Sequence, residues 1–329
     1  MKHKNITLAH GSGGKLTHEL VRKLFLPTFN NNALSLLGDS AILNINGAKL
    51  AFTTDSYVVK PLFFPGGDIG RLAVSGTIND LAVVGAEPMF LSAGFIIEEG
   101  FEMSLLEKIV SSMRETTALT GVDIVTGDTK VVERGSADGL YINTCGIGIV
   151  NDGINLSISS IEIGDKVIIS GTLGDHGMAV LSERESLGFT PSIKSDCAPL
   201  SGMIKKILAS GARIKFMRDP TRGGLATTLN EIVNAQKYGI VIEEQTIPIN
   251  DGVRALCEIL GYDPLYIANE VKVVIIVSAH DAERMCDILK EDSLGRDAAI
   301  IGEVVVEPKG KICLKTVIGG TRIIDMLVG

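Results

Sequence analysis

The first half of the chain carries apolar residues at two spacings, one typical of helices and one of strands. Helical spacing predicts helices at Lys15–Phe25, Ile69–Gly85 and Glu102–Leu119, the last closed by Gly121 as C-cap. Strand-like runs predict a hairpin of Ala41–Ile45 and Leu50–Thr53 about Asn46-Gly47, and further strands at Phe90–Ile97, Val122–Val125 and Gly139–Val150.

The turn-rich stretch Asn151-Asp152-Gly153 separates this half from a second one of similar pattern. There we predict strands at Lys166–Ser170, Ile240–Glu243, Val271–Ser278 and Ala298–Val306, and helices at Gly177–Leu187, Pro220–Ala235 and Asp281–Lys290. Asp219 is the expected N-cap of the helix that starts at Pro220. The order of elements indicates an α/β or α+β fold with mixed sheets, in two domains, 1–150 and 151–329.

Composition narrows the class of protein. With 329 residues and 45% hydrophobic content, a large core is available. The net charge of −8 comes without a basic block, which argues against nucleic acid or an anionic membrane as partner. The five cysteines are odd in number and far apart, which disfavours a disulfide framework or a zinc site. No signal peptide or membrane-spanning run is visible, so we expect a soluble cytoplasmic protein.

Four aspartates follow small or polar residues beside apolar segments: Asp39, Asp55, Asp80 and Asp128. Each one alone is compatible with an ordinary turn or cap. If they converge, however, their like charges would raise one another's pKa unless a cation lay among them. Oxygen ligands without His or Cys favour Mg²⁺, which often bridges to phosphates. The pattern therefore predicts a magnesium site for nucleotide-dependent phosphoryl chemistry.

Two glycine-containing stretches suit phosphate binding. "HGSGGKLT" contains Gly11, Ser12, Gly13 and Gly14 but fails both the P-loop and the dinucleotide fingerprint, so a flexible loop and a flap over phosphates both remain open. "MRDPTRGGLA" places Asp219 and Arg222 beside a glycine pair, which suits phosphate at a helix start, or simply a capped helix with surface ion pairs.

Glu270 stands just before an apolar strand, in "YIANEVKVVI". It is either a solvated strand end or a general base at the rim of a site.

Taken together, "LAHGSGGK", "FTTDSYVVKPLFFPGG", "GTINDLAVVGAEP", "TGDTKVVERG", "SGTLGDHG", "RDPTRGGLA" and "ANEVK" resemble the HypE family of hydrogenase maturation factors, within the AIR synthase-related (PurM-like) superfamily. The resemblance covers nearly the whole chain. It implies two α/β domains, with the N-terminal domains paired into a β-barrel across a homodimer.

The resemblance also implies cofactors and residue roles. ATP and Mg²⁺ would lie at Asp39, Asp55, Asp80 and Asp128, under the glycine-rich segment, and Lys130 and Glu270 would be the catalytic pair. Further nucleotide contacts are expected from Thr54, Asn79, Thr129, Asp219 and Arg222.

The implied reaction converts an S-carbamoyl group on a C-terminal cysteine into a thiocyanate at the expense of ATP. The implied partners are a HypF-like carbamoyltransferase, which makes the S-carbamoyl group, and a HypC–HypD-like scaffold, which takes the cyanide to the iron of a [NiFe] hydrogenase. Family members end in Pro-Arg-Ile-Cys, whereas this chain ends in "IIDMLVG". Either the given chain is shortened or the natural protein has lost the modification site; as given, we expect ATP binding without turnover in cis.

Two alternatives remain open. One is another enzyme of the superfamily, of the thiamine-phosphate kinase, selenophosphate synthetase or AIR synthase type. A reactive Cys near the start, typical of selenophosphate synthetases, is absent before Cys145. The other is a non-catalytic, ATP-gated scaffold for maturation partners.

Overall fold

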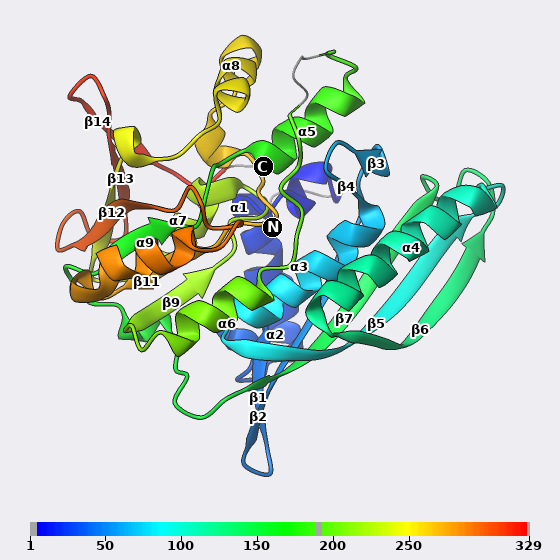
Figure 1. The fold of residues 1–329 in the computed structure, drawn as a ribbon, viewed down its shortest axis with the longest axis horizontal. Coiled ribbons are helices and arrows are strands. Elements are labelled where there is room, and N and C mark those ends of the chain that lie inside the picture. The colour runs from blue at the N-terminus through cyan, green and yellow to red at the C-terminus, as the bar shows by residue number, and fades with distance from the viewer. Residues whose placement is uncertain (1–4, 189–192, 328–329) are drawn as a thin grey trace.

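The computed structural model describes residues 5–188 and 193–327, which form two sheet-and-helix units packed against each other (Figure 1). Both units contain strands and helices, and both main sheets are mixed, which confirms the predicted α/β class. Within the described ranges, no helix has the length and apolarity needed to cross a bilayer. Gly329, after which the family's tail is expected, lies outside the described residues.

The first unit is built on a five-stranded sheet of order β1-β2-β7-β5-β6. Its strands are β1 (Ala41–Ile45), β2 (Ala48–Tyr57), β5 (Ala86–Glu98), β6 (Asp123–Val132) and β7 (Leu140–Val150). Neighbouring strands are antiparallel except β5 and β6, because the helix between them returns the chain to the same end of the sheet. A short ribbon of β3 (Phe63–Phe64) and β4 (Gly67–Asp68) follows β2.

Helices α3 (Ile69–Val83) and α4 (Met103–Thr120) cover one face of this sheet (Figure 1). Asp68 caps α3 by accepting hydrogen bonds from the N–H groups of Gly70 (2.7 Å) and Arg71 (3.1 Å). Nearly all of α3 is buried, because it lies between the first sheet and the second unit. Helix α4 ends at Gly121 with φ 69°, which confirms the predicted C-cap.

The second unit has a seven-stranded sheet of order β14-β13-β10-β12-β8-β11-β9. Its strands are β8 (Lys166–Ile169), β9 (Ile214–Arg218), β10 (Gly239–Glu243), β11 (Val274–Val277), β12 (Ala299–Val305), β13 (Ile312–Lys315) and β14 (Thr321–Ile324). Its helices are α5 (Asp175–Arg184), α6 (Ser201–Ala209), α7 (Gly224–Val233), α8 (Asp251–Leu260) and α9 (Ala282–Lys290).

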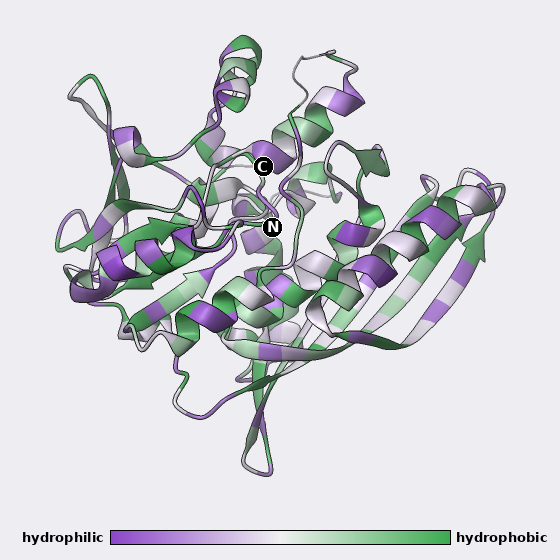
Figure 2. Ribbon diagram, in the orientation of Figure 1, coloured by the Kyte–Doolittle hydropathy of each residue, from purple (hydrophilic) through white to green (hydrophobic). Residues whose placement is uncertain are grey.

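Apolar clusters lie on both faces of the second sheet. Ile169 packs toward α7 on one face, whereas Ile168 packs toward α6 and α9 on the other. Burial on both faces explains why β8 and β11 read as continuous apolar runs rather than alternating ones. The strands carry apolar stretches in both units, whereas the outer side of α4 is rich in polar residues (Figure 2).

The beginning and the end of the described chain meet on the second unit. Helix α1 (Lys15–Leu20) continues through a π-helical turn at Val21–Phe25 into α2 (Leu26–Phe29), so the helix predicted at Lys15–Phe25 is longer and interrupted. The N–H of Lys15 donates to the carbonyl of Leu327 (2.8 Å).

Two predicted boundaries are wrong in ways that matter for function. The helix expected from Pro220 begins at Gly224, with Gly223 as N-cap, so Asp219 is not its N-cap. Gly223 and Gly224 have φ of 78° and 61°, and this left-handed pair turns residues 219–223 into a loop. The strand expected at Val122–Val125 continues to Val132, so Asp128 and Lys130 lie within β6 rather than after it.

Candidate functional site

A cavity of about 410 Å³ lies between the two units, where β2 and α3 face α5 and the loops before α7 and β11. Its apolar lining includes Val59, Leu72, Met178, Tyr262 and Ile267. Its charged lining includes Asp55, Asp80, Arg184, Asp219, Arg222 and Glu270. The cavity therefore presents acid groups and two arginines together with apolar side chains.

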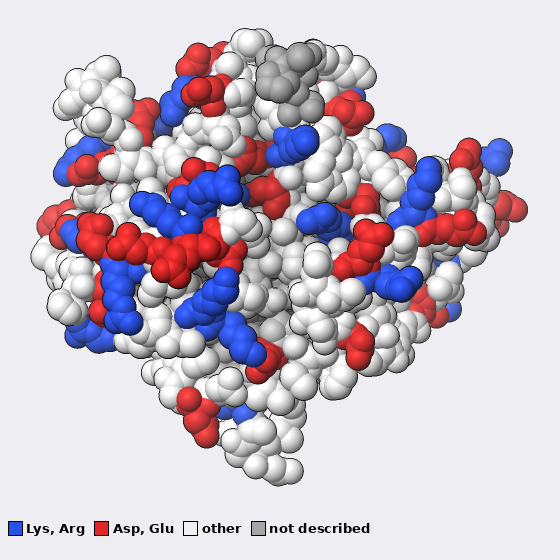
Figure 3. All heavy atoms as spheres, in the orientation of Figure 1, with Lys and Arg blue, Asp and Glu red and all other residues white. Residues whose placement is uncertain are grey.

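A second cavity of about 330 Å³ adjoins the first and shares Asp219, Thr221 and Arg222 with it. It extends to Gly13 and Asp39, so the two cavities together reach from the glycine-rich segment to Glu270. On the face drawn in Figure 3, acidic and basic side chains are intermixed around the middle of the molecule.

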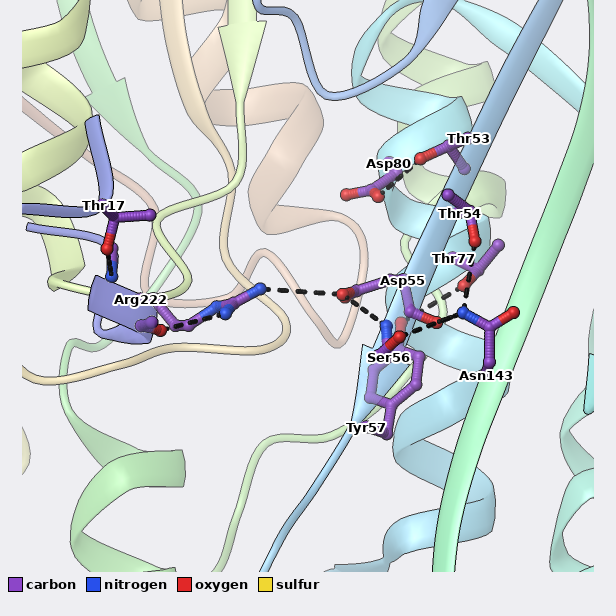
Figure 4. Close-up of polar contacts among 12 residues, drawn as sticks. Thr17, Thr53, Thr54, Asp55, Ser56, Tyr57, Thr77, Asp80, Asn143 and Arg222 are labelled. Atoms are coloured by element: carbon purple, nitrogen blue, oxygen red, sulfur yellow. Dashed lines mark hydrogen bonds and ion pairs between the residues drawn. The ribbon is translucent and has the colours of Figure 1, made fainter. Parts of the chain in front are cut away.

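Asp80 lies near the C-terminal end of α3, and the Thr53 hydroxyl is 3.0 Å from its Oδ2 (Figure 4). Burial raises the pKa of Asp80 well above its usual range, and the charges of Asp219, Asp39 and Asp55 raise it further. Burial, then the charge of Asp39, raises the pKa of Asp219 to about 8. The structure thus brings Asp39, Asp55 and Asp80, three of the four aspartates predicted for a cation site, close enough to repel one another, and it adds Asp219 to them.

Asp39 has a fixed counter-ion. Its Oδ1 lies 3.1 Å from Nε of Arg218, which also lies 3.2 Å from Oε2 of Glu231. Burial raises the pKa of Asp39, while the Arg218 charge opposes that rise. Arg218 therefore balances part of the negative charge of Asp39 and Glu231, which line the second cavity with it.

Arg222 links the glycine-rich segment to Asp55. Its Nη1 donates to the Gly11 carbonyl (3.1 Å) and its Nη2 lies 3.6 Å from Oδ1 of Asp55 (Figure 4). Gly13 has φ +82°, and a Cβ there would lie 2.8 Å from Cβ of Arg222. Only glycine fits this close approach, so the segment of Gly11, Ser12, Gly13 and Gly14 lies directly on the Arg222 loop.

Glu270 is not a solvated strand end. Its side chain is only 16% exposed. Burial raises its pKa well above the usual range, reinforced by the charges of Asp219, Asp196 and Asp55. A buried carboxyl with a raised pKa in a cavity wall is a candidate for proton transfer.

Asn79 occupies a different place from the one predicted. It is fully buried, donates to the carbonyls of Ala198 (3.3 Å) and Glu270 (3.0 Å), and accepts from the N–H of Leu200 (2.7 Å). These bonds use both amide hydrogens, so Asn79 offers no donor to a nucleotide in this geometry. Its side chain instead joins α3 to two segments of the second unit and holds the backbone of Glu270.

Four predicted site residues lie away from the cavity: Thr54, Asp128, Thr129 and Lys130. Thr54 bonds on the sheet itself, to the Thr144 carbonyl (3.2 Å) and the Asn143 amide (3.2 Å). The side chains of Asp128 and Lys130 are each 70% exposed on edge strand β6, with 3.4 Å between Oδ2 and Nζ. A single copy of the described chain therefore does not bring these residues to Glu270.

The residues at the cavity have the oxygen ligands that Mg²⁺ prefers, but they do not form a complete coordination shell. Among the described residues, no group of three or more His, Cys, Asp or Glu side chains is arranged to hold a metal ion. The available donors are nevertheless all carboxylates with raised pKa values, which a cation would lower. Mg²⁺ needs only one or two such ligands, because water and phosphate oxygens complete its shell.

No role for His176, which lines the cavity, was predicted from the sequence. It is 7% exposed and bonds to Ser195. Its only signal was its place in "SGTLGDHG", next to Asp175 at the start of α5.

Comparisons with known proteins agree on one family. The AIR synthase related N-terminal domain matches residues 37–150, and the C-terminal domain of the same name matches residues 162–315. The chain is 49% identical to the carbamoyl dehydratase HypE of Bradyrhizobium diazoefficiens, over 98% of this chain and 94% of that one. It is 46% identical to the HypE of Escherichia coli, over 98% and 96%.

Solved structures give the same result. A crystal structure of a HypE–HypF complex matches with TM-score 0.89 at 49% identity, covering 94% of this chain and 99% of that one. HypE in complex with ATP matches with TM-score 0.83 at 45% identity, covering 98% of each. A thiamine monophosphate kinase of Aquifex aeolicus, at 17% identity and TM-score 0.67, shares the fold over 91% of this chain and 97% of that one. The chain belongs to the HypE carbamoyl dehydratase family, within the AIR synthase-related proteins.

Proposed function

We propose that this chain carries out the ATP-dependent dehydration of an S-carbamoyl group on a C-terminal cysteine to a thiocyanate, the cyanide-forming step of [NiFe] hydrogenase maturation. The observation that carries the proposal is Glu270, a buried carboxyl with a raised pKa, facing a cavity that also holds Asp80, Asp219 and Arg222. Relatives at 45–49% identity are named carbamoyl dehydratases, and one was solved with ATP.

The chemistry needs two steps. The carbamoyl oxygen is a poor leaving group, so it first takes the γ-phosphoryl group of ATP, releasing ADP and one nitrogen proton. Loss of phosphate and the second nitrogen proton then forms the C≡N bond. A raised pKa makes the Glu270 carboxylate a stronger base, which suits removal of a proton from nitrogen.

The remaining charged residues suit the nucleotide. Asp39, Asp55 and Asp80 would hold Mg²⁺, which neutralises phosphate charge when bound. Arg222 and the backbone of the segment from Gly11 to Gly14 would contact phosphates, with Asp219 beside them. We assign Lys130 to the charge of the transferring phosphoryl group, with Asp128, Thr129 and Thr54 as further ligands from the sheet.

We infer that the chain forms a homodimer through the uncovered face of the first sheet. Phe52, Phe90 and Ile147 are in register across β2, β5 and β7 and are 43%, 43% and 42% exposed. Asp128 and Lys130 are in register with Gly94 and Ile96 of β5. Closing this face with a second copy would bury the apolar residues in a barrel and place β6 of one copy near the other.

We also propose the partners. A relative has been solved as a HypE–HypF complex, which supports a HypF-like carbamoyltransferase as the source of the S-carbamoyl group. A HypC–HypD-like iron scaffold would accept the cyanide. All five cysteines are free thiols, which suits a reducing cytoplasm.

The test is ADP formation from Mg-ATP with and without an S-carbamoylated peptide ending in Pro-Arg-Ile-Cys. Peptide-dependent ADP with an equal amount of peptide thiocyanate, read by mass spectrometry, is the expected result. Without stimulation, the peptide sequence is fused after Gly329 and carbamoylated. ATP binding without thiocyanate from either form would contradict the proposal and favour an ATP-gated scaffold.

A further inference from the structure

His176 lies in the cavity wall, and the proposed function gives it no task. Its imidazole faces Ser195 on one side and Glu270 on the other. A buried imidazole between a hydroxyl and a carboxyl has a defined tautomer, because each ring nitrogen must suit its neighbour.

The Ser195 side suits Nδ1 as an acceptor. Nδ1 lies 2.9 Å from Oγ of Ser195, and that Oγ already accepts a hydrogen bond from the N–H of Cys197 (3.1 Å). The hydroxyl proton is then free to point at Nδ1. Burial lowers the pKa of His176 to about 4, so the ring is neutral at physiological pH. With Nδ1 accepting from Ser195, its single ring proton would lie on Nε2.

The Nε2 side faces the proposed base. Nε2 lies 3.9 Å from Oε1 of Glu270, which is longer than a hydrogen bond. Contacts of this kind commonly shorten when substrate binds. A small side-chain rotation would let Nε2–H donate to the carboxylate and leave the second oxygen directed at the cavity.

The first unit holds both His176 and Ser195 in place. Phe64 of β3 packs edge-to-face on the imidazole, with 5.5 Å between ring centroids and an interplanar angle of 88°. The N–H of Ser195 donates to the Pro65 carbonyl (2.7 Å), and a Cβ on Gly66 would clash with the Ser195 backbone. The ring is therefore clamped between the units, as alignment of a reacting group requires.

We propose that His176 is a positioning residue for Glu270: its Nε2–H holds the reactive carboxylate toward the cavity, and Ser195 keeps the imidazole in that tautomer. This inference rests on the proposed role of Glu270 as base. Lys272 pairs with Asp196 at 2.6 Å, so the carboxylate whose charge acts on His176 is already balanced. The other charged groups acting on Glu270 are Asp55, Asp219 and Arg222.

The tautomer can be measured directly. Histidine ¹⁵N labelling of the full chain, with His176→Gln used to assign the signal, is expected to show a neutral ring protonated on Nε2 between about pH 6 and 8. A ring protonated on Nδ1, or a charged ring, would overturn the proposal whether or not any variant is active.

Kinetics test whether His176 supports turnover. The assay uses Mg-ATP and the S-carbamoylated substrate, free peptide or fused tail, that yields thiocyanate. His176→Phe keeps a ring against Phe64 but removes both nitrogens, and it should lower kcat about 10–100-fold with little change in the KM for ATP. His176→Gln can donate to Glu270 and accept from Ser195, and it should recover much of that loss. The exposed His280 supplies the matched control His280→Phe. Full activity of His176→Phe, or no recovery in His176→Gln, contradicts the inference.

A double variant separates the positioning role of His176 from the proposed role of Glu270 as base. In a Glu270→Gln background, His176→Phe should lower kcat no further, because its effect passes through the missing carboxylate. If Glu270→Gln alone were fully active, the assignment of the base would fail. If Glu270→Gln were impaired while His176→Phe reduced its activity by the same factor as in the wild type, only the positioning role would fail.

Discussion

The cavity between the units and edge strand β6 carry two parts of one predicted site in opposite environments. In the cavity, Asp80, Asp219 and Glu270 are largely removed from water and their pKa values are raised by burial and by one another. On β6, the side chains of Asp128 and Lys130 are each 70% exposed and form an ion pair with each other. A single copy of the chain therefore forms the buried acidic part of the predicted site, whereas the Lys130 ammonium group lies exposed on β6.

This difference shows that the cavity carboxylates and the β6 ammonium group become reactive for different reasons. A carboxylate in a cavity becomes a strong base through its own surroundings. An exposed ammonium gains strength only when something covers it, because water screens its charge. Single substitutions in the cavity should therefore lower activity directly, whereas the contribution of β6 should depend on association with a second copy.

The largest effect is expected for Glu270→Gln. Loss of a general base costs about 10²–10⁴-fold in turnover, whereas ATP binding should persist because the Arg222 loop is unchanged. Thiocyanate formation and ATP titration measure the two effects. Glu303→Gln, which alters only the pair of Glu303 with Lys166 on the second sheet, is the matched control. Equal turnover in Glu270→Gln and Glu303→Gln would mean that the buried Glu270 carboxylate does not act as the base.

Mixing two inactive variants tests whether β6 serves another copy. Lys130→Ala and Asp80→Asn should each leave only residual thiocyanate formation while remaining folded. If each site uses Asp80 of one copy and Lys130 of the other, refolding an equal mixture should restore about a quarter of wild-type activity, since half the dimers contain one intact site. No recovery in dimers shown to be mixed would place both residues in the same copy.

The pH dependence of stability tests the acidic part. In the folded chain the pKa of Asp219 is raised to about 8 from the usual 3.8. Between these values the folded state holds a proton that the unfolded state has lost, so this residue's contribution to stability is complete below about pH 4 and declines as pH rises toward 8.

Asp219→Asn should therefore flatten the fall in Tm between pH 5 and 8 in metal-free buffer, and stabilise the chain by about 1–3 kcal/mol at pH 8. Thermal unfolding at several pH values measures this. Asp128→Asn, on the exposed strand, is the matched control. A fall in stability on Asp219→Asn would show that the ionised carboxylate is stabilising.

Much of this site follows from the sequence, and the reasons for the exceptions are physical. The helix carrying Asp80 was predictable because α3 is a long segment with apolar residues at helical spacing. The loop holding Asp219 and Arg222 was mistaken for a helix, because a proline after an aspartate is a common helix start and the left-handed pair Gly223-Gly224 is a backbone property.

Residues defined by tertiary contacts could not be placed from sequence. The resemblance implied that Asn79, next to Asp80, contacts the nucleotide, but its amide is hydrogen-bonded to backbone groups more than a hundred residues away. A role for His176 can be inferred only from the fold, which places Ser195 and Glu270 on either side of its ring. The full extent of β6 was missed because an exposed edge strand has no buried face to impose alternation.

The smallest effect is expected for the stability of Lys130→Ala. Since the side chain is 70% exposed and its contact with Asp128 is a surface pair, the free energy of unfolding of dilute, monomeric chain should change by less than about 0.5 kcal/mol. Denaturant unfolding at low protein concentration measures it, with Lys23→Ala, from a surface pair with Glu19, as reference. A loss of several kcal/mol would mean that Lys130 is held by contacts within one chain. A loss that appears only at high concentration would place Lys130 in the interface between copies.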